Sequence, residues 1–161
     1  MAGYWFPGVR LPQFPFNTLN GQLVLGLTAD PVQTFVVGGV IHYLSGIIWA
    51  VIFALVVSPA LGHYVKPLAA MTPVNNYVKG LLWGIALWII SSALWMPLLI
   101  DPLYGGNVVG PFLTKFGPYG VQALFSNLLW HTVYGANLGL LFSPTPVGAR
   151  TWRPTSAVGM R

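Results

Sequence analysis

The chain contains no cysteine and only two acidic residues, Asp30 and Asp101. Without cysteine it forms no disulfide, thiolate metal site, iron–sulfur cluster or cysteine nucleophile. Charged residues make up 6% of its 161 residues, against about 25% in a soluble domain. So little charge excludes a soluble enzyme or a disordered chain, and seven dispersed cations form no nucleic-acid-binding stripe. We therefore expect no catalytic residues, no metal site and no nucleic-acid partner.

Apolar residues are abundant instead, at 55% of the chain, and the mean hydropathy is +0.70. Three apolar stretches each reach the roughly 20 residues that a membrane span requires. The first stretch starts at Asp30-Pro31, where Asp suits the N-cap and proline suits the first helical position. The sequence therefore predicts an all-α integral membrane protein with three transmembrane helices, at about 31–58, 79–101 and 119–143.

The remaining segments flank these helices within a single membrane domain, 1–161. Residues 1–30 contain Pro7, Pro12 and Pro15, which interrupt any helix and favour an irregular N-terminal arm. Residues 21–29 are apolar but too short to span, so an interfacial half-helix is the most that we expect there. The bundle then covers 31–143, and 144–161 form a polar, basic C-terminal tail.

The cations predict the orientation of the three spans. Lys66, Lys79, Arg150, Arg153 and Arg161 fall on the side of the second loop and the tail, whereas Arg10 and Lys115 fall on the other. The positive-inside rule then places the N-terminus outside and the C-terminus in the cytoplasm, with a prokaryotic cytoplasmic membrane as the expected location.

The first and third spans match each other at an offset of 89 residues, which aligns His42 with His131. Each histidine is followed by small residues at four-residue steps, which let helix backbones approach closely in a membrane. We interpret these small residues as packing faces of two parallel helices. The residues concerned are Gly46, Ala50 and Ala54 in the first span and Gly135, Gly139 and Ser143 in the third.

His42, His131 and Asn127, one turn before His131, are the polar side chains of these faces. One interpretation is that the imidazoles bind a b-type haem between two helices, or a quinone. A second is that neutral histidines make hydrogen bonds across a helix interface, which the small-residue faces favour because close backbones leave no room for a macrocycle. A third interpretation is that the histidines belong to a proton path. No cofactor follows firmly from the sequence, and the three interpretations stay open.

The H-x-x-x-G pattern at His42 and the ending HTVYGANLGLLFSP resemble small uncharacterised prokaryotic multi-pass membrane proteins that repeat this histidine–glycine pattern. The resemblance covers the first and third spans. It implies the membrane class and brings no activity with it.

Three functions are compatible with these features. The first is a non-catalytic accessory subunit of a larger energy-transducing complex, respiratory or photosynthetic, that packs on core helices beside lipids and other membrane subunits. The second is an electron-transfer subunit that binds haem b or quinone through His42 and His131. The third is a small transporter or channel protomer that forms oligomers.

Overall fold

The computed structural model describes residues 3–6, 9–12, 15–106, 109–110, 112 and 121–142. The helical class is confirmed, and the segment that differs most from prediction is the N-terminal arm. There, β1 (Gly3–Phe6) and β2 (Val9–Pro12) form an antiparallel hairpin, and α1 (Phe16–Leu25) follows. The predicted irregular arm is therefore wrong. The prolines precede α1 instead of interrupting it, and Gly26, with a φ of 88°, ends the helix.

The first long helix is one continuous rod of three parts. It comprises α2 (Pro31–Ile52), a π-helical turn η1 (Phe53–Val57) and α3 (Ser58–Tyr64). The Asp30 carboxylate caps its start by accepting hydrogen bonds from the backbone N–H groups of Val32 and Gln33 at 3.0 Å. The predicted end near residue 58 is wrong, because the wide π turn accommodates Pro59 in the first turn of α3.

The second long helix also exceeds its predicted bounds of 79–101. It starts at Pro73, where the hydroxyl of Thr72 accepts a hydrogen bond from the N–H of Asn75 at 3.2 Å. It runs through α4 (Pro73–Ile90), the π-helical η3 (Ser91–Ile100) and α5 (Asp101–Leu103). A short 3₁₀ turn, η2 (Lys66–Leu68), lies in the loop that joins the two long helices.

Both long helices, Pro31–Tyr64 with 34 residues and Pro73–Leu103 with 31, are long and apolar enough to cross a membrane. The third described helix, α6 (Val121–Leu141), carries more polar side chains, including Asn127, His131 and Asn137. The predicted start at 119 and end at 143, the site residue Ser143 and the tail lie outside the described residues.

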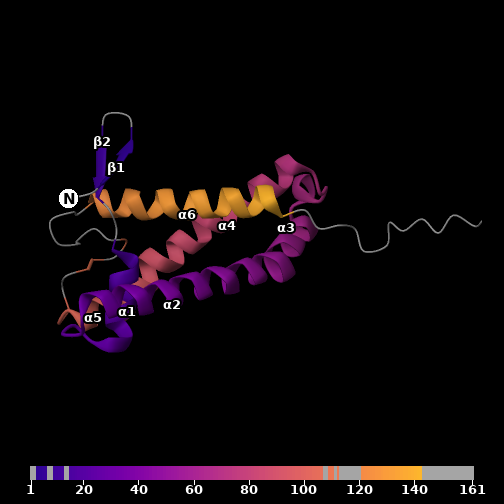
Figure 1. Cartoon of the computed structure of the whole chain (residues 1–161). Coiled ribbons are helices and arrows are strands. Elements are labelled where there is room, and N and C mark those ends of the chain that lie inside the picture. The colour runs from indigo at the N-terminus through magenta and orange to yellow at the C-terminus, as the bar shows by residue number, and fades with distance from the viewer. Residues whose placement is uncertain are drawn as a thin grey trace, which may run out of the picture.

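Figure 1 shows that α2 and α6 run in the same direction and that α4 runs in the opposite direction. Contacts at both ends of the α4–α6 pair show that it is antiparallel. Asn76 donates a hydrogen bond to the carbonyl of Phe142 at 3.0 Å, whereas Asn127, near the start of α6, bonds Ser92 at 2.9 Å. Thus α6 lies along α4 over most of the length of both helices.

Two apolar clusters hold the described helices together. At the end of the bundle near α1 and α5, Leu19 of α1 packs with Met96 and Ile100 of η3, Val109 and Ala123. Towards the other end, rings from three helices pack together, and Trp49, Phe53, Trp83, Tyr134 and Phe142 contribute them. The helix α1 therefore belongs to the folded core, and its hydrogen bond from Tyr104 to Gln22 ties it to the end of the second long helix.

Candidate functional site

The two helices that carry the predicted histidine pair lie beside each other in matching register. Phe53 and Phe142, which are 89 positions apart like His42 and His131, have ring centroids 5.4 Å apart. Near them, the Tyr134 hydroxyl donates a hydrogen bond to the carbonyl of Gly46 at 2.6 Å. Equivalent positions of the two similar helices are therefore neighbours in space.

A residue of α1 stands beside both imidazoles. The ring centroid of Phe16 lies 5.7 Å from that of His42 and 6.5 Å from that of His131. Sequence reasoning did not assign Phe16 to this site, because only the fold of the N-terminal segment places α1 against α2 and α6. The histidine cluster, as we name it, consists of Phe16, Asn17, His42, Asn127 and His131.

Each imidazole is oriented through its Nδ1 atom. Nδ1 of His42 lies 3.0 Å from the side-chain oxygen of Asn17, and Nδ1 of His131 lies 2.8 Å from the backbone carbonyl of Asn127. Since both partners are carbonyl oxygens, each Nδ1 acts as the donor, and the neutral ring then keeps an unprotonated Nε2. The two rings therefore present the same type of acceptor atom.

Below His131, α6 is joined to α4 by a buried polar contact. The Asn127 side chain is completely buried and donates to the Ser92 hydroxyl at 2.9 Å and towards Ser91 at 3.4 Å. Its side-chain oxygen has no hydrogen-bond partner among the described residues. The serines lie at the start of the π-helical η3, a type of segment that is frequent at functional sites.

The predicted packing residues Gly135 and Gly139 make the tightest contacts of α6. A Cβ atom at Gly135 would lie 2.3 Å from the carbonyl oxygen of Gly80, and one at Gly139 would lie 2.3 Å from that of Asn76. The partner surface is a Gly80-x-x-x-Gly84 motif on α4, which sequence reasoning missed although the spacing was visible.

The predicted packing face of the first span behaves differently. A Cβ atom at Gly46 would meet nothing within 4 Å, and Ala50 and Ala54 are half-buried. The close contacts of α2 are instead at Gly38, whose Cβ would overlap the carbonyl oxygen of Asn17 at 1.6 Å. The small residues of α2 thus admit α1, whereas α6 contacts the middle of α2 through large aromatic side chains.

The ability of the histidine cluster to hold a cofactor depends on Phe16. The described residues contain no group of three or more histidine, cysteine or acidic side chains that could hold a metal ion. A haem with both imidazoles as axial ligands would have to displace the Phe16 ring, which contacts both. A flat quinone ring bonded to one Nε2 demands less rearrangement, because Phe16 could stay beside it.

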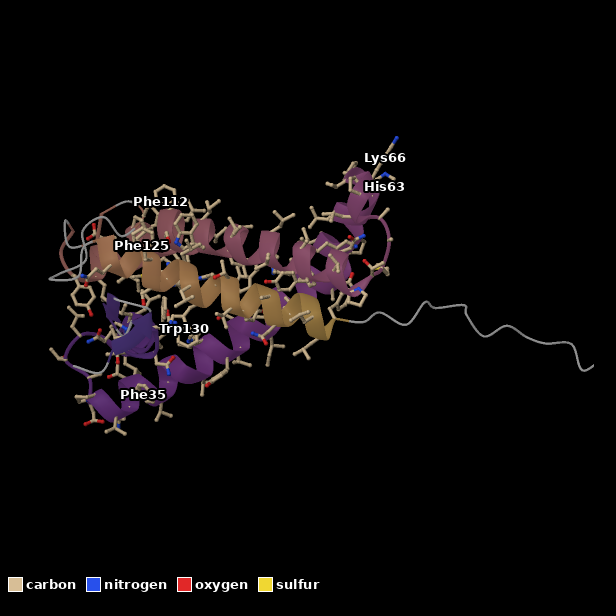
Figure 2. The ribbon with its side chains drawn as sticks, turned by 90° about the horizontal axis from the view of Figure 1, so that it is seen from above. Phe35, His63, Lys66, Phe112, Phe125 and Trp130 are labelled. Carbon is tan, nitrogen blue, oxygen red and sulfur yellow. The ribbon has the colours of Figure 1, made fainter. Side chains whose placement is uncertain are left out.

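Other polar residues lie outside the histidine cluster. Asp101 does not end its helix as expected; its carboxylate accepts the N–H of Val109 at 2.8 Å, and the helix continues to Leu103. Next to that loop, burial raises the pKa of the Tyr104 hydroxyl above its ordinary value of 10.0. His63 lies exposed in α3, and Figure 2 shows it beside Lys66 at the tip of the bundle.

No protein family model, curated protein or solved structure matches this chain.

Proposed function

We propose that this chain is an accessory subunit of a larger energy-transducing membrane complex, respiratory or photosynthetic, and that it packs against core helices without catalysing a reaction. The carrying observation is the long uncovered surface of α2. Large apolar side chains are exposed along it from one end to the other, namely Val32, Phe35, Val36, Val40, Tyr43, Leu44, Ile47, Ile48 and Val51.

Such a helix needs an apolar environment on most of its circumference. In water, this much contiguous apolar surface would cause aggregation, whereas lipid or the helices of neighbouring subunits cover it without cost. Several polar side chains of the described residues are engaged in hydrogen bonds within the bundle, which favours a packing role over transport or catalysis. A packing role is the function that remains.

The proposal includes three membrane crossings. The two long helices meet the length and hydropathy that a span requires, and α6 follows α4 from Asn76 at one end to Ser92 at the other. If α4 crosses the bilayer, α6 therefore lies at the same depth. Its polar Asn127 is hidden against α4, where it avoids the lipid.

Purification from the native membrane tests this function. A tagged chain, expressed at its native level and extracted in mild detergent, should co-purify with other integral membrane subunits that mass spectrometry identifies. Val40→Ser together with Ile47→Ser on the exposed surface should weaken this association. The same double change leaves the described packing between α4 and α6 untouched.

Migration on a native gel as the single chain or as a homo-oligomer would contradict the proposal. A homo-oligomer without other subunits would favour the small transporter or channel instead.

A second candidate function is supported by the shared orientation of the two imidazoles beside Phe16. Both rings use Nδ1 for a carbonyl oxygen, and such hydrogen bonds are typical of histidines whose other nitrogen binds a partner. An electron-transfer subunit would then hold a quinone, or a haem b after displacement of Phe16, between α1, α2 and α6.

The visible spectrum of the purified chain and extraction of bound quinone test this candidate. A haem band or a stoichiometric quinone that is lost in His42→Ala and in His131→Ala, but kept in His63→Ala, which lies in α3 away from the histidine cluster, would support it. A colourless chain without quinone would exclude it.

A further inference from the structure

Lys79 is a completely buried cation without an acidic partner. Its side chain is 0% exposed on α4, and within the described residues its Nζ has one hydrogen-bond acceptor, the sulfur of Met71 at 3.7 Å. A Cβ atom on Gly62 of α3 would lie 3.5 Å from the same nitrogen. A thioether is a weak acceptor, so the ammonium group is poorly stabilised by its surroundings.

The chain itself has no acidic side chain to offer. Its two acids are Asp30 and Asp101, and both bind backbone N–H groups at the opposite end of the long helices. Lys79 lies near the start of α4, whereas Asp30 precedes α2 and Asp101 follows η3. Neither acidic side chain can therefore balance the charge of Lys79.

Two further buried donors that have no partner among the described residues lie one helical turn away from Gly62 and Lys79, on α3 and α4. Ser58 is one helical turn before Gly62 on α3, and its buried hydroxyl has no partner in the described part of the chain. Trp83 is one turn after Lys79 on α4, and its buried indole N–H is also unpaired there. We call Lys79, with Met71 and Gly62 beside its Nζ atom, the lysine site. The ammonium group alone carries three N–H donors, so the site matches an anion that accepts several hydrogen bonds.

The position of Lys79 along its helix matches the depth of lipid phosphates. The 31-residue helix Pro73–Leu103 is about 46 Å long at 1.5 Å per residue, against a hydrocarbon core of about 30 Å. About 8 Å would project from each side of the bilayer when the helix is centred. Lys79 is about 9 Å from the start of the helix, at the boundary between the acyl chains and the headgroups.

A flexible side chain forms part of the cover over the lysine site. Met71, whose sulfur contacts Nζ, is 52% exposed and lies in the loop before α4. Methionine has three rotatable bonds and changes conformation easily. Rotation of Met71 would therefore release the ammonium group from its contact with the sulfur.

We propose that the lysine site binds the phosphate of an anionic phospholipid, which replaces the sulfur of Met71 as the partner of Lys79. A zwitterionic phosphatidylcholine already carries its own cation, so an anionic headgroup is the better match for an unbalanced ammonium. The inference rests on membrane insertion as proposed above, and it concerns the isolated chain irrespective of any complex.

The test uses the purified full chain in a neutral detergent, with phosphatidylglycerol, phosphatidylcholine or inorganic phosphate added. Phosphatidylglycerol should raise the unfolding temperature, and native mass spectrometry should show that it is retained in preference to phosphatidylcholine. In Lys79→Met, the affinity for phosphatidylglycerol should fall about tenfold, since a charge-assisted hydrogen bond is lost. Lys79→Arg should keep the preference.

Lys66→Met is the matched control, because it removes one positive charge from the same end of the chain at an exposed position. It should change the affinity by less than about twofold. Lys79→Met should fold, because an apolar side chain of similar size relieves the buried charge.

Four results would overturn the inference. If the wild-type chain retained phosphatidylglycerol and phosphatidylcholine in proportion to the amounts added, it would have no site for an anionic lipid, whatever the variants showed. An equal response to inorganic phosphate would indicate a free anion as the ligand. If Lys79→Met still preferred phosphatidylglycerol, Lys79 would not bind the lipid, and its charge would be balanced by another group, such as a carboxylate of a partner subunit. If Lys79→Met and Lys66→Met lost equal affinity for phosphatidylglycerol, the lipid would respond to the total surface charge and not to one site. Because a complex is not involved, the absence of co-purifying subunits would contradict the proposed function and leave the lipid site standing.

Discussion

Two helical glycines of this chain, Gly135 and Gly46, differ in whether a neighbouring helix lies close to them. At Gly135 an added Cβ would lie 2.3 Å from the Gly80 carbonyl oxygen, whereas at Gly46 it would meet nothing within 4 Å. Glycine in a helix costs stability unless a close contact requires it. The two positions therefore form a natural pair for testing where the helices touch.

We expect Gly135→Ala to destabilise the protein by about 1–3 kcal/mol, because α4 and α6 must separate to admit the methyl group. Gly46→Ala should leave stability unchanged or raise it by up to about 1 kcal/mol, since the helix gains propensity without a clash. Unfolding of the purified chain in mixed micelles by increasing sodium dodecyl sulfate measures both.

If the two alanine variants were equally stable, the direct contact between the backbones of α4 and α6 would be wrong. If Gly46→Ala were the less stable one, the close contact would lie on α2, as the sequence pattern suggested.

At the scale of helices, α2 is attached to the rest of the bundle in a way that differs from the α4–α6 pair. The middle of α2 contacts its neighbours through rings, with centroids 5.8 Å apart for Trp49 and Trp83 and 5.4 Å for Phe53 and Phe142. At its start, α2 packs closely on α1 at Gly38. Large side chains therefore set the distance between α2 and the other two helices.

Phe53 should carry much of this attachment, because its ring is completely buried at the π-helical turn. Phe53→Ala should destabilise the chain by about 3–5 kcal/mol through the cavity left behind. Phe35→Ala on the same helix is the control: Phe35 is 56% exposed, and Figure 2 shows it on the outer side of α2.

The same detergent titration compares the two variants, and Phe35→Ala should stay within about 0.5 kcal/mol of the wild type. Similar losses for both would mean that the exposed surface of α2 is as tightly packed as its inner surface, contrary to this structure.

For the molecule as a whole, the distribution of cations predicts one orientation in the membrane. Thr28 and Ala70 are exposed residues that flank the first long helix, and the absence of cysteine makes a single introduced thiol the only one in the chain. A membrane-impermeant maleimide should label Thr28→Cys in intact cells and Ala70→Cys only after the membrane is opened.

Labelling of Ala70→Cys alone in intact cells would reverse the orientation. Labelling of both thiols from outside would show that Pro31–Tyr64 does not cross the bilayer.

The helical class of the protein and much of its helix content could be predicted from the sequence. Long apolar stretches with few charges predicted two of the helices, and Asp30-Pro31 marked the start of the first. The ends were less predictable, because Ser58-Pro59 looked like a terminator although a π turn carries the helix past it. The hairpin was missed, and the short helix considered for 21–29 instead occupies Phe16–Leu25, since closely spaced prolines mask short elements that only tertiary contacts hold in place.

The residues of the candidate site were also only partly predictable from the sequence. His42, Asn127 and His131 could be chosen from the sequence because ionisable and amide side chains are rare in apolar helices. Phe16 and Asn17 could not, since nothing in an isolated N-terminal segment indicates that it packs beside two distant histidines. The sequence also did not reveal that Gly80 and Gly84, instead of the first span, face Gly135.

The nine charged residues among 161 by themselves indicated that this chain belongs in an apolar environment. That conclusion rests on composition, which does not depend on how the chain folds. Only the tertiary structure decided which helix each small residue touches, and that Lys79 is buried far from both acids. The physical reason is that burial and pairing depend on neighbours distant in the sequence, which no local pattern records.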